Sequence, residues 1–163
     1  MSDANNQYLT FTLGEEVFAL EIASVREVLE YTSITKVPRT PEYIRGVINL
    51  RGRAVPVVDV RLKFGMPATE RTVNTCIIIV EVELEGESTV LGALSDSVKE
   101  VMDIEPENIE PAPRIGTSIK ADFIRGIGKH GENFIILLDI DKVFSEEELL
   151  QLAGAGAEPE AAA

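Results

Sequence analysis

The fold is decided by the stretch Tyr43-Ile44-Arg45-Gly46-Val47-Ile48-Asn49-Leu50-Arg51-Gly52-Arg53-Ala54-Val55-Pro56-Val57-Val58-Asp59-Val60. It holds two apolar runs, Val47-Ile48 and Val55 to Val60, with a polar tip between them. Gly52 in that tip suits a turn position that needs positive φ. The pattern predicts a β-hairpin. Because Pro56 has no N–H to donate, the returning strand is expected to be an edge strand or to be bulged at that point.

The same stretch occurs again 80 residues later. Phe123-Ile124-Arg125-Gly126-Ile127-Gly128 echoes Tyr43 to Ile48, and Leu137 to Ile140 answers Val57 to Val60. An earlier pair, Ser24 to Val28 and Ser97 to Val101, repeats at a shift of 73. The two shifts place an insertion in the loop around Pro106 to Ser118. The period is too long for a solenoid repeat and indicates two copies of one small unit.

Composition limits what these units can be. A repeat of about 70 to 80 residues is marginal for an isolated core, so the two copies are expected to bury a shared face. The chain is 45% apolar, has no Trp and is only 6% aromatic, which predicts a core of Val, Ile and Leu. A single cysteine excludes an internal disulfide and favours a reducing compartment. No signal peptide or membrane span is recognisable in the sequence, so we expect a soluble cytoplasmic protein.

Charge is unevenly distributed. The net charge of −13 comes entirely from the second half, residues 81–163, because the charges of residues 1–80 sum to zero. A basic segment lies in the first half and comprises Lys36, Arg39, Arg45, Arg51, Arg53, Arg61 and Lys63. Its cations either belong to an ordinary solvated face or form a patch that docks an acidic partner. Nucleic acid is disfavoured, because the remaining field would repel phosphate.

The remaining segments also favour a mainly β protein. Strands are predicted at residues 8–13, 17–22, 76–84 and 90–94. A short helix or helical turn is predicted where Ile22, Val25, Val28 and Leu29 fall at helical spacing. A second helix is expected at the C-terminus, after the capping box Ser145 to Glu148, and residues 153–163 form a flexible tail. Many short strands without crossover helices favour small barrels or a sandwich over a parallel α/β fold.

No motif makes a convincing enzyme. Gly126-Ile127-Gly128-Lys129-His130-Gly131 matches G-x-G-x-x-G, but a strand follows it where a dinucleotide site needs a helix. Cys76 lies in a buried-type strand and is interpreted as a core residue. A divalent-metal site using Asp139, Asp141 and Glu146 stays open as an alternative, as does a small enzymatic β domain. No catalytic residue and no cofactor is predicted.

A binding module remains. Val25-Arg26-Glu27-Val28 and Val98-Lys99-Glu100-Val101 place apolar residues beside charged ones in both units. All four valines could be core residues. Alternatively, some line a groove between the units that accepts an amphipathic helix.

The hairpin residues resemble a known family. Ile44-Arg45-Gly46-Val47-Ile48-Asn49-Leu50-Arg51-Gly52 and Val55 to Arg61 look like the signature of the CheW family of bacterial chemotaxis coupling proteins, and Phe11 to Gly14 and Pro111 to Pro113 also fit. The resemblance covers residues 8–152. It implies two five-stranded SH3-like β-barrels around a shared apolar core, at approximately residues 8–66 and 75–144, with strands possibly exchanged between them.

The resemblance also implies a function. Members are adaptors that join the cytoplasmic tips of chemoreceptors to the regulatory domain of the histidine kinase CheA, in arrays at the inner face of the membrane. By position, it assigns receptor contact to Val25, Val28, Arg51, Cys76, Val98 and Val101. Gly46, Asn49 and Gly52 are expected to shape the hairpin. An adaptor in a receptor–kinase pathway other than chemotaxis remains a further alternative.

Overall fold

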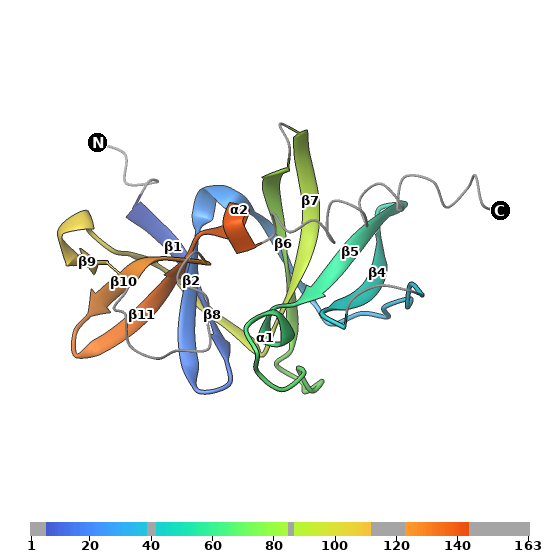
Figure 1. Ribbon diagram of the computed structural model, residues 1–163, viewed down its shortest axis with the longest axis horizontal. Helices are drawn as coiled ribbons and strands as arrows, with labels where there is room; N and C mark the ends of the chain where they lie inside the picture. The colour runs from blue at the N-terminus through green and yellow to red at the C-terminus, as the bar shows by residue number, and fades with distance from the viewer. Residues whose placement is uncertain (1–5, 39–41, 85–86, 112–122, 144–163) are drawn as a thin grey trace.

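The computed structural model describes residues 6–38, 42–84, 87–111 and 123–143. Within this part the chain is mainly β, as predicted, and its strands form two sheets (Figure 1). The first sheet comprises, in spatial order, β8 (Ser97–Asp103), β1 (Gln7–Leu13), β2 (Glu16–Glu21), β11 (Asn133–Leu138), β10 (Ile124–His130) and β9 (Ile109–Glu110). The second comprises β3 (Val25–Glu30), β6 (Cys76–Leu84), β7 (Glu87–Ser95), β5 (Arg53–Asp59) and β4 (Ile44–Leu50).

Helical structure in the described residues is short. It consists of the 3-10 turns η2 (Ile22–Ser24) and η3 (Pro106–Asn108) and the single-turn helices α1 (Val60–Lys63) and α2 (Ile140–Val143). None of these helices has the length and apolar character needed to cross a membrane. The helix predicted after Ser145 lies outside the described residues.

Each sheet takes strands from both halves of the chain. β1 and β2, from the first half of the chain, pair in the same sheet as β8 to β11. β6 and β7, from the second half, pair in the same sheet as β3, β4 and β5. The chain therefore passes between the sheets at two crossovers, one after β2 and one between β7 and β8. A hydrophobic pattern along the chain carries no signal for this exchange.

The duplication is visible in the strand pairing. Val57 of β5 pairs in parallel with Gly92 of β7, and Leu137 of β11 pairs in parallel with Ala19 of β2. These partners differ by the same shifts, 80 and 73, that relate the sequence repeats. Both hairpins also carry a register shift at the same place, between Ile44 and Gly46 and between Ile124 and Gly126. The two sheets are therefore copies of one unit, and the extra strand β9 gives the first sheet six strands instead of the predicted five.

The position of Pro56 in the first hairpin agrees with its lack of a backbone N–H. Pro56 pairs with Val47 of β4, and pairing of β5 with β7 begins one residue later, at Val57. The missing N–H therefore lies just before the part of β5 that is paired on both sides. β5 is a central strand of its sheet and not the edge strand that was predicted. The hairpin does have a register shift, but it lies between Ile44 and Gly46 of β4 and not at Pro56.

The core consists of one hydrophobic cluster that both sheets share and two smaller clusters, one for each sheet. The shared cluster takes residues from both sheets, among them Leu9, Phe11, Ile78 and Val80. Val, Ile and Leu make up most of the buried hydrophobic residues, as predicted, but phenylalanines add to them. Four rings form a continuous row through the shared cluster, Phe11–Phe18–Phe64–Phe123, with successive centroids 5.8–6.0 Å apart. Few aromatic residues suffice here because they are concentrated where the two units meet.

Candidate functional site

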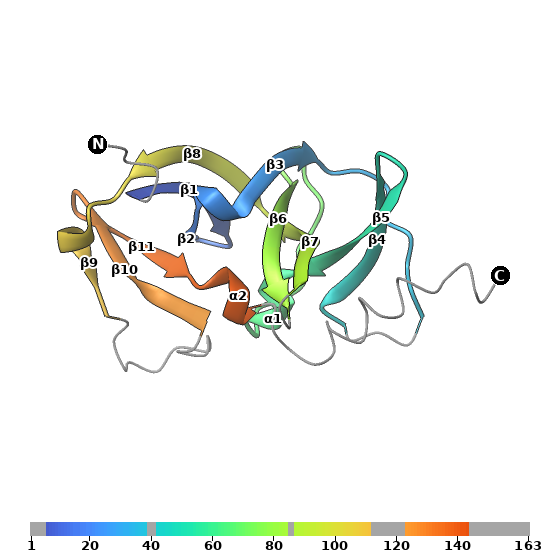
Figure 2. The ribbon, with the colours of Figure 1, turned by 90° about the horizontal axis from the view of Figure 1, so that it is seen from above.

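Two edge strands run along one side of the molecule. Figure 2 shows β8 and β3 following each other along this side, with α1 and α2 on the opposite side. β8 ends the first sheet and β3 ends the second, so each pairs with a single neighbouring strand in the recorded order. These strands hold the four valines to which the resemblance assigns receptor contact.

On β3, two valines lie on the face that the sheet turns toward the shared cluster. Val25 pairs with Val80 and Val28 pairs with Ile78, and both partners belong to the shared cluster. Directly paired residues point to the same face of a sheet. Val25 is half-buried and packs against the shared cluster, whereas Val28 keeps 40% of its surface exposed.

On β8 the arrangement repeats. Val98 pairs with Phe11 and Val101 with Leu9, and both partners belong to the shared cluster. Val98 packs against this cluster, and Val101 is 45% exposed. We call the four residues Val25, Val28, Val98 and Val101 the β3–β8 surface. It is an apolar rim where the shared core reaches solvent. Val25 and Val98 pack against the core, whereas Val28 and Val101 are exposed and available to a partner.

Cys76 extends the same face. It lies two residues from Ile78 along β6, opposite Glu30 of β3, and its side chain is half-buried. The thiol donates to the carbonyl of Asn74, with sulfur and oxygen 3.3 Å apart. Cys76 thus lies at the far end of β3 from Val25.

Arg51 lies at the tip of the β4–β5 hairpin and contacts the side chain of Glu27 on β3. Its two terminal nitrogens donate to the two carboxylate oxygens of Glu27, at 2.8 Å and 3.0 Å. The Arg51 side chain is 70% exposed and that of Glu27 is 29% exposed. The resemblance implies receptor contact for Arg51, whereas in the structure a carboxylate of the chain itself occupies its guanidinium fork. No short-range pattern could have revealed Glu27 as the partner.

This ion pair has a measurable signature. The hydrogen bond from Arg51 lowers the pKa of the Glu27 carboxyl below its ordinary value of 4.5. A carboxyl whose pKa is depressed by folding contributes stability above its unfolded pKa and loses it as the pH falls through the folded pKa. We expect a ¹³C NMR titration to give the Glu27 carboxyl a pKa below its ordinary value. In the Arg51→Gln variant this pKa should rise again. An unchanged Glu27 titration in that variant would show that the pair does not persist in solution.

The residues expected to shape the hairpin lie at its bulge and its tip. Gly46 has φ of +141°, and a Cβ there would lie 2.1 Å from the carbonyl oxygen of Thr35. The side chain of Asn49 accepts a hydrogen bond from the backbone N–H of Gly52 at 2.7 Å. Arg51 and Gly52 both have positive φ, at 52° and 85°. The tip is therefore a two-residue turn of the kind that suits the twist of a hairpin.

The short helix or helical turn predicted over Ile22 to Leu29 is confirmed only as a turn. Only Ile22–Ser24 forms a 3-10 turn, and β3 begins at Val25. A register shift between Val25 and Glu27 inserts an extra residue opposite β6 and breaks the simple alternation. Beyond the bulge, Val28 faces the shared cluster but stays 40% exposed on the edge strand, so an apolar residue at an accessible position imitates helical spacing.

The basic segment does not form a free cationic patch. Three of its arginines are paired with carboxylates of the chain, Arg45 with Asp59, Arg51 with Glu27 and Arg61 with Asp96. Lys63 lies over the rings of Tyr43 and Phe123, and Arg39 lies outside the described residues. Most of these cations therefore serve the fold, and a docking role for the segment as a whole is not supported.

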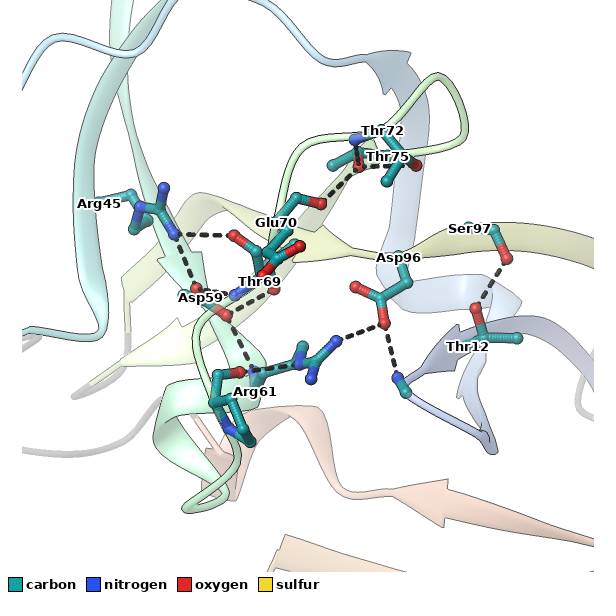
Figure 3. A network of polar contacts seen from close by, with 12 residues as sticks. Thr12, Arg45, Asp59, Arg61, Thr69, Glu70, Thr72, Thr75, Asp96 and Ser97 are labelled. Atoms are coloured by element: carbon teal, nitrogen blue, oxygen red, sulfur yellow. Dashed lines mark hydrogen bonds and ion pairs between the residues drawn. The ribbon is translucent and has the colours of Figure 1, made fainter.

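Asp59 is the centre of a buried polar network (Figure 3). Its carboxylate is fully buried and accepts four hydrogen bonds. The donors are the Arg45 guanidinium at 2.9 Å, the Thr69 backbone N–H at 2.9 Å, the Thr69 hydroxyl at 2.8 Å and the Arg61 backbone N–H at 3.1 Å. The last of these bonds caps α1. Asp59 thus fixes the connector that leads from the first hairpin to β6.

A polar hollow of about 520 Å³ lies beside this network. Arg61 and Asp96 line it, and they are joined at 2.8 Å. Asp96 also accepts the backbone N–H of Gly14, which belongs to the turn between β1 and β2. Because Arg61, the one cation among the described residues that line it, is already paired with Asp96, the hollow is a weaker candidate for ligand binding than the β3–β8 surface.

Two of the carboxylates considered for a metal site accept hydrogen bonds from backbone N–H groups. Asp139 accepts the N–H of Lys142 at 3.4 Å, and Asp141 accepts the N–H of Glu83 at 3.2 Å. Glu146 lies outside the described residues. Within the described ranges, no three His, Cys, Asp or Glu side chains are grouped closely enough to hold a metal ion. His130 is at the exposed end of β10, where the G-x-G-x-x-G pattern forms a hairpin tip between two strands.

Comparison with known proteins agrees with this geometry. Residues 7–148 match the family described as the CheW-like domain. The chemotaxis protein CheW of Klebsiella aerogenes is 36% identical over 143 residues, covering 88% of this chain and 84% of that protein. The chemotaxis protein CheW of Rhizobium meliloti is 34% identical over 148 residues, covering 91% of this chain and 93% of that protein. The crystal structure of the scaffolding protein TtCheW from Thermoanaerobacter tengcongensis is 38% identical, with a TM-score of 0.78, and the match covers 88% of this chain and 90% of that one. The predicted class of two related SH3-like units is thereby confirmed.

Proposed function

The chain belongs to the family of CheW-like domains, and from this premise we propose that it is a chemotaxis adaptor that couples the cytoplasmic hairpin of a chemoreceptor to the regulatory domain of the histidine kinase CheA. It is a scaffold and not an enzyme, as the family and its solved relative indicate. Its place is the cytoplasm, at receptor arrays on the inner face of the membrane, without insertion into the lipid and without nucleic acid. An adaptor for a receptor system other than chemotaxis would use the same surface and differ only in its receptor.

The observation that carries the proposal is the β3–β8 surface. Four large hydrophobic side chains are strongly exposed in the described residues, and two of them, Val28 and Val101, hold equivalent positions in the two units. They lie at the rim of the shared core, next to half-buried valines on rigid strands. A partner helix laid across both edge strands could bury both valines at once, because apolar side chains on one face of a helix recur every three or four residues.

We expect Val28→Asp to weaken binding of a chemoreceptor cytoplasmic fragment at least ~10-fold, because it places a charge in the apolar centre of the contact. Calorimetric titration measures this change, and receptor-dependent CheA activation in a reconstituted assay should fall with it. Val101→Asp should have a similar effect through the second unit.

The chain offers a matched control for this experiment. Val73 is 99% exposed in the connector before β6, so Val73→Asp adds the same charge away from the β3–β8 surface. Val28→Asp is preferable to a change at Val25, which packs against the shared core and whose replacement would mix folding with binding. If Val28→Asp, Val101→Asp and Val73→Asp all bind the receptor fragment like the wild type, the proposed receptor site is wrong.

A further inference from the structure

The internal duplication gives Glu27 an exact counterpart, Glu100. Val25 pairs with Val80 and Glu27 with Ile79 across the bulge in β3. In β8, Val98 pairs with Phe11, and the backbone N–H and carbonyl of Glu100 both bond to the hydroxyl of Thr10. Thr10 precedes Phe11 as Ile79 precedes Val80, so the two glutamates occupy the same place in the same kind of bulge.

The counterpart of Arg51 has no side chain. The β4–β5 turn consists of Arg51 and Gly52, since Leu50 pairs with Arg53. The β10–β11 turn consists of Gly131 and Glu132, since His130 pairs with Asn133. Gly131 therefore stands where Arg51 stands in the first unit. The arginine that neutralises the glutamate of β3 is missing from the unit that contains β8.

The carboxylate of Glu100 consequently differs from that of Glu27. Glu27 is held by both nitrogens of Arg51. Glu100 is exposed, and among the described residues the structure records no ion pair for its carboxylate. It precedes Val101 in β8, so its side chain leaves the opposite face of the strand, but β8 is an edge strand whose free side lets one partner reach both residues.

The charge of the surroundings favours a cationic group at this position. Residues 95–110 hold a single basic side chain, the exposed Lys99, against the acidic residues Asp96, Glu100, Asp103, Glu105, Glu107 and Glu110. Asp103, Glu105 and Glu107 follow Glu100 and are also exposed. An acidic field attracts a basic side chain and repels a carboxylate or phosphate.

We propose that Glu100 is a recognition residue that receives a lysine or arginine from the receptor helix bound at the β3–β8 surface, so that the partner supplies in the second unit the cation that Arg51 supplies in the first. The inference rests on the proposed function and adds a chemical requirement to it. The helix must present a long basic side chain that reaches past the free edge of β8 to Glu100 while an apolar residue contacts Val101. The pair would also orient the helix, because only the β8 side of the rim offers a free carboxylate at this position.

Two variants test the pairing against the same receptor fragment by calorimetry. Glu100→Lys should weaken binding about 10-fold, and the loss should shrink as salt is raised, since a rim ion pair is screened. Gly131→Arg leaves Glu100 in place but supplies the missing arginine from within the chain. Its guanidinium would compete for the carboxylate and should weaken binding about 3-fold. The positive φ at this position is tolerated by Arg51 in the equivalent turn.

Two controls separate the outcomes. Glu107→Lys makes the same charge change on η3, away from β8, and should alter binding less than 2-fold if the effect at Glu100 is local. Val28→Asp reports on the binding site itself. If Val28→Asp loses binding while Glu100→Lys and Gly131→Arg bind like the wild type, the pairing is wrong and the proposed adaptor function stands. If Glu107→Lys weakens binding as much as Glu100→Lys, the field and not Glu100 is responsible, and the pairing is again wrong. If Val28→Asp and Val101→Asp bind normally, the receptor site and the inference fail together.

Discussion

The Asp59→Ala variant is expected to lose about 3 to 5 kcal/mol of unfolding free energy, the range for breaking a buried ion pair by removing one partner. The carboxylate is fully buried, and its four hydrogen bonds come from Arg45, Arg61 and both polar groups of Thr69. Alanine would leave the buried N–H and hydroxyl of Thr69 without an acceptor and would remove the ion-pair partner of Arg45. The connector to β6 would lose its anchor at the same time. Urea denaturation followed by circular dichroism measures the loss.

The duplication supplies the control for this variant. Asp139 is the counterpart of Asp59, but it is only half-buried and accepts the N–H of Lys142 at 3.4 Å. Asp139→Ala should therefore cost about 1 kcal/mol, the usual loss for a helix cap. Equal losses at the two positions would mean that the network around Asp59 contributes nothing beyond capping.

Much of this fold could be predicted because its hairpins are local. A hairpin of two apolar runs around a polar tip depends on residues close in sequence, and its recurrence at a shift of 80 made the duplication visible. The parallel pairs Val57–Gly92 and Leu137–Ala19 confirm that both copies dock in the same way. Strand exchange was left open at the sequence level, because the pairing of β1 with β8 joins residues about 90 positions apart and no periodicity records it.

The candidate site was predicted in its residues but not in its arrangement. Position alone selected the valines of β3 and β8, yet only the pairing of Val28 with Ile78 and of Val101 with Leu9 shows that they extend the face of the shared core. The spacing that indicated a helix came from Val28, an apolar residue at an accessible position. Local rules fail most often where a residue serves a partner and not the fold. The part of the predicted helical segment that instead forms strand β3 coincides with the proposed binding surface.

The ion pair of Arg51 shows a different limit. The side chain belongs to a hairpin tip and its partner to a strand at the other edge of the same sheet, so they meet only when the sheet curves. Sequence reasoning offered the guanidinium to a receptor. In the structure it binds Glu27, whereas Glu100, the counterpart of Glu27, has no ion pair among the described residues. Under the inference above, the carboxylate that receives a partner's cation therefore lies in the second unit.

The largest loss of stability is expected for Gly46→Ala, at about 4 kcal/mol or more, which places it among the exceptional single substitutions. The new Cβ would lie 2.1 Å from the carbonyl oxygen and 2.7 Å from the carbonyl carbon of Thr35. That carbonyl cannot move freely, because Thr35 and Val47 exchange two backbone hydrogen bonds of 2.8 Å. The φ of +141° adds strain for any residue with a side chain. Since folded domains are stable by only about 5 to 15 kcal/mol, much of the variant should be unfolded at modest urea concentrations.

Two other glycines show whether this loss comes from the close approach. Gly52 also has positive φ, but a Cβ there meets nothing within 4 Å, so Gly52→Ala should cost only about 1 kcal/mol of backbone strain. Gly126 is the counterpart of Gly46, and its Cβ would lie 2.9 Å from the carbonyl oxygen of Glu110. Gly126→Ala should fall between the two, because the overlap is smaller and β9 is only two residues long. If Gly46→Ala and Gly52→Ala lose equal stability, backbone strain alone explains both, and the contact with Thr35 does not determine why this bulge requires glycine.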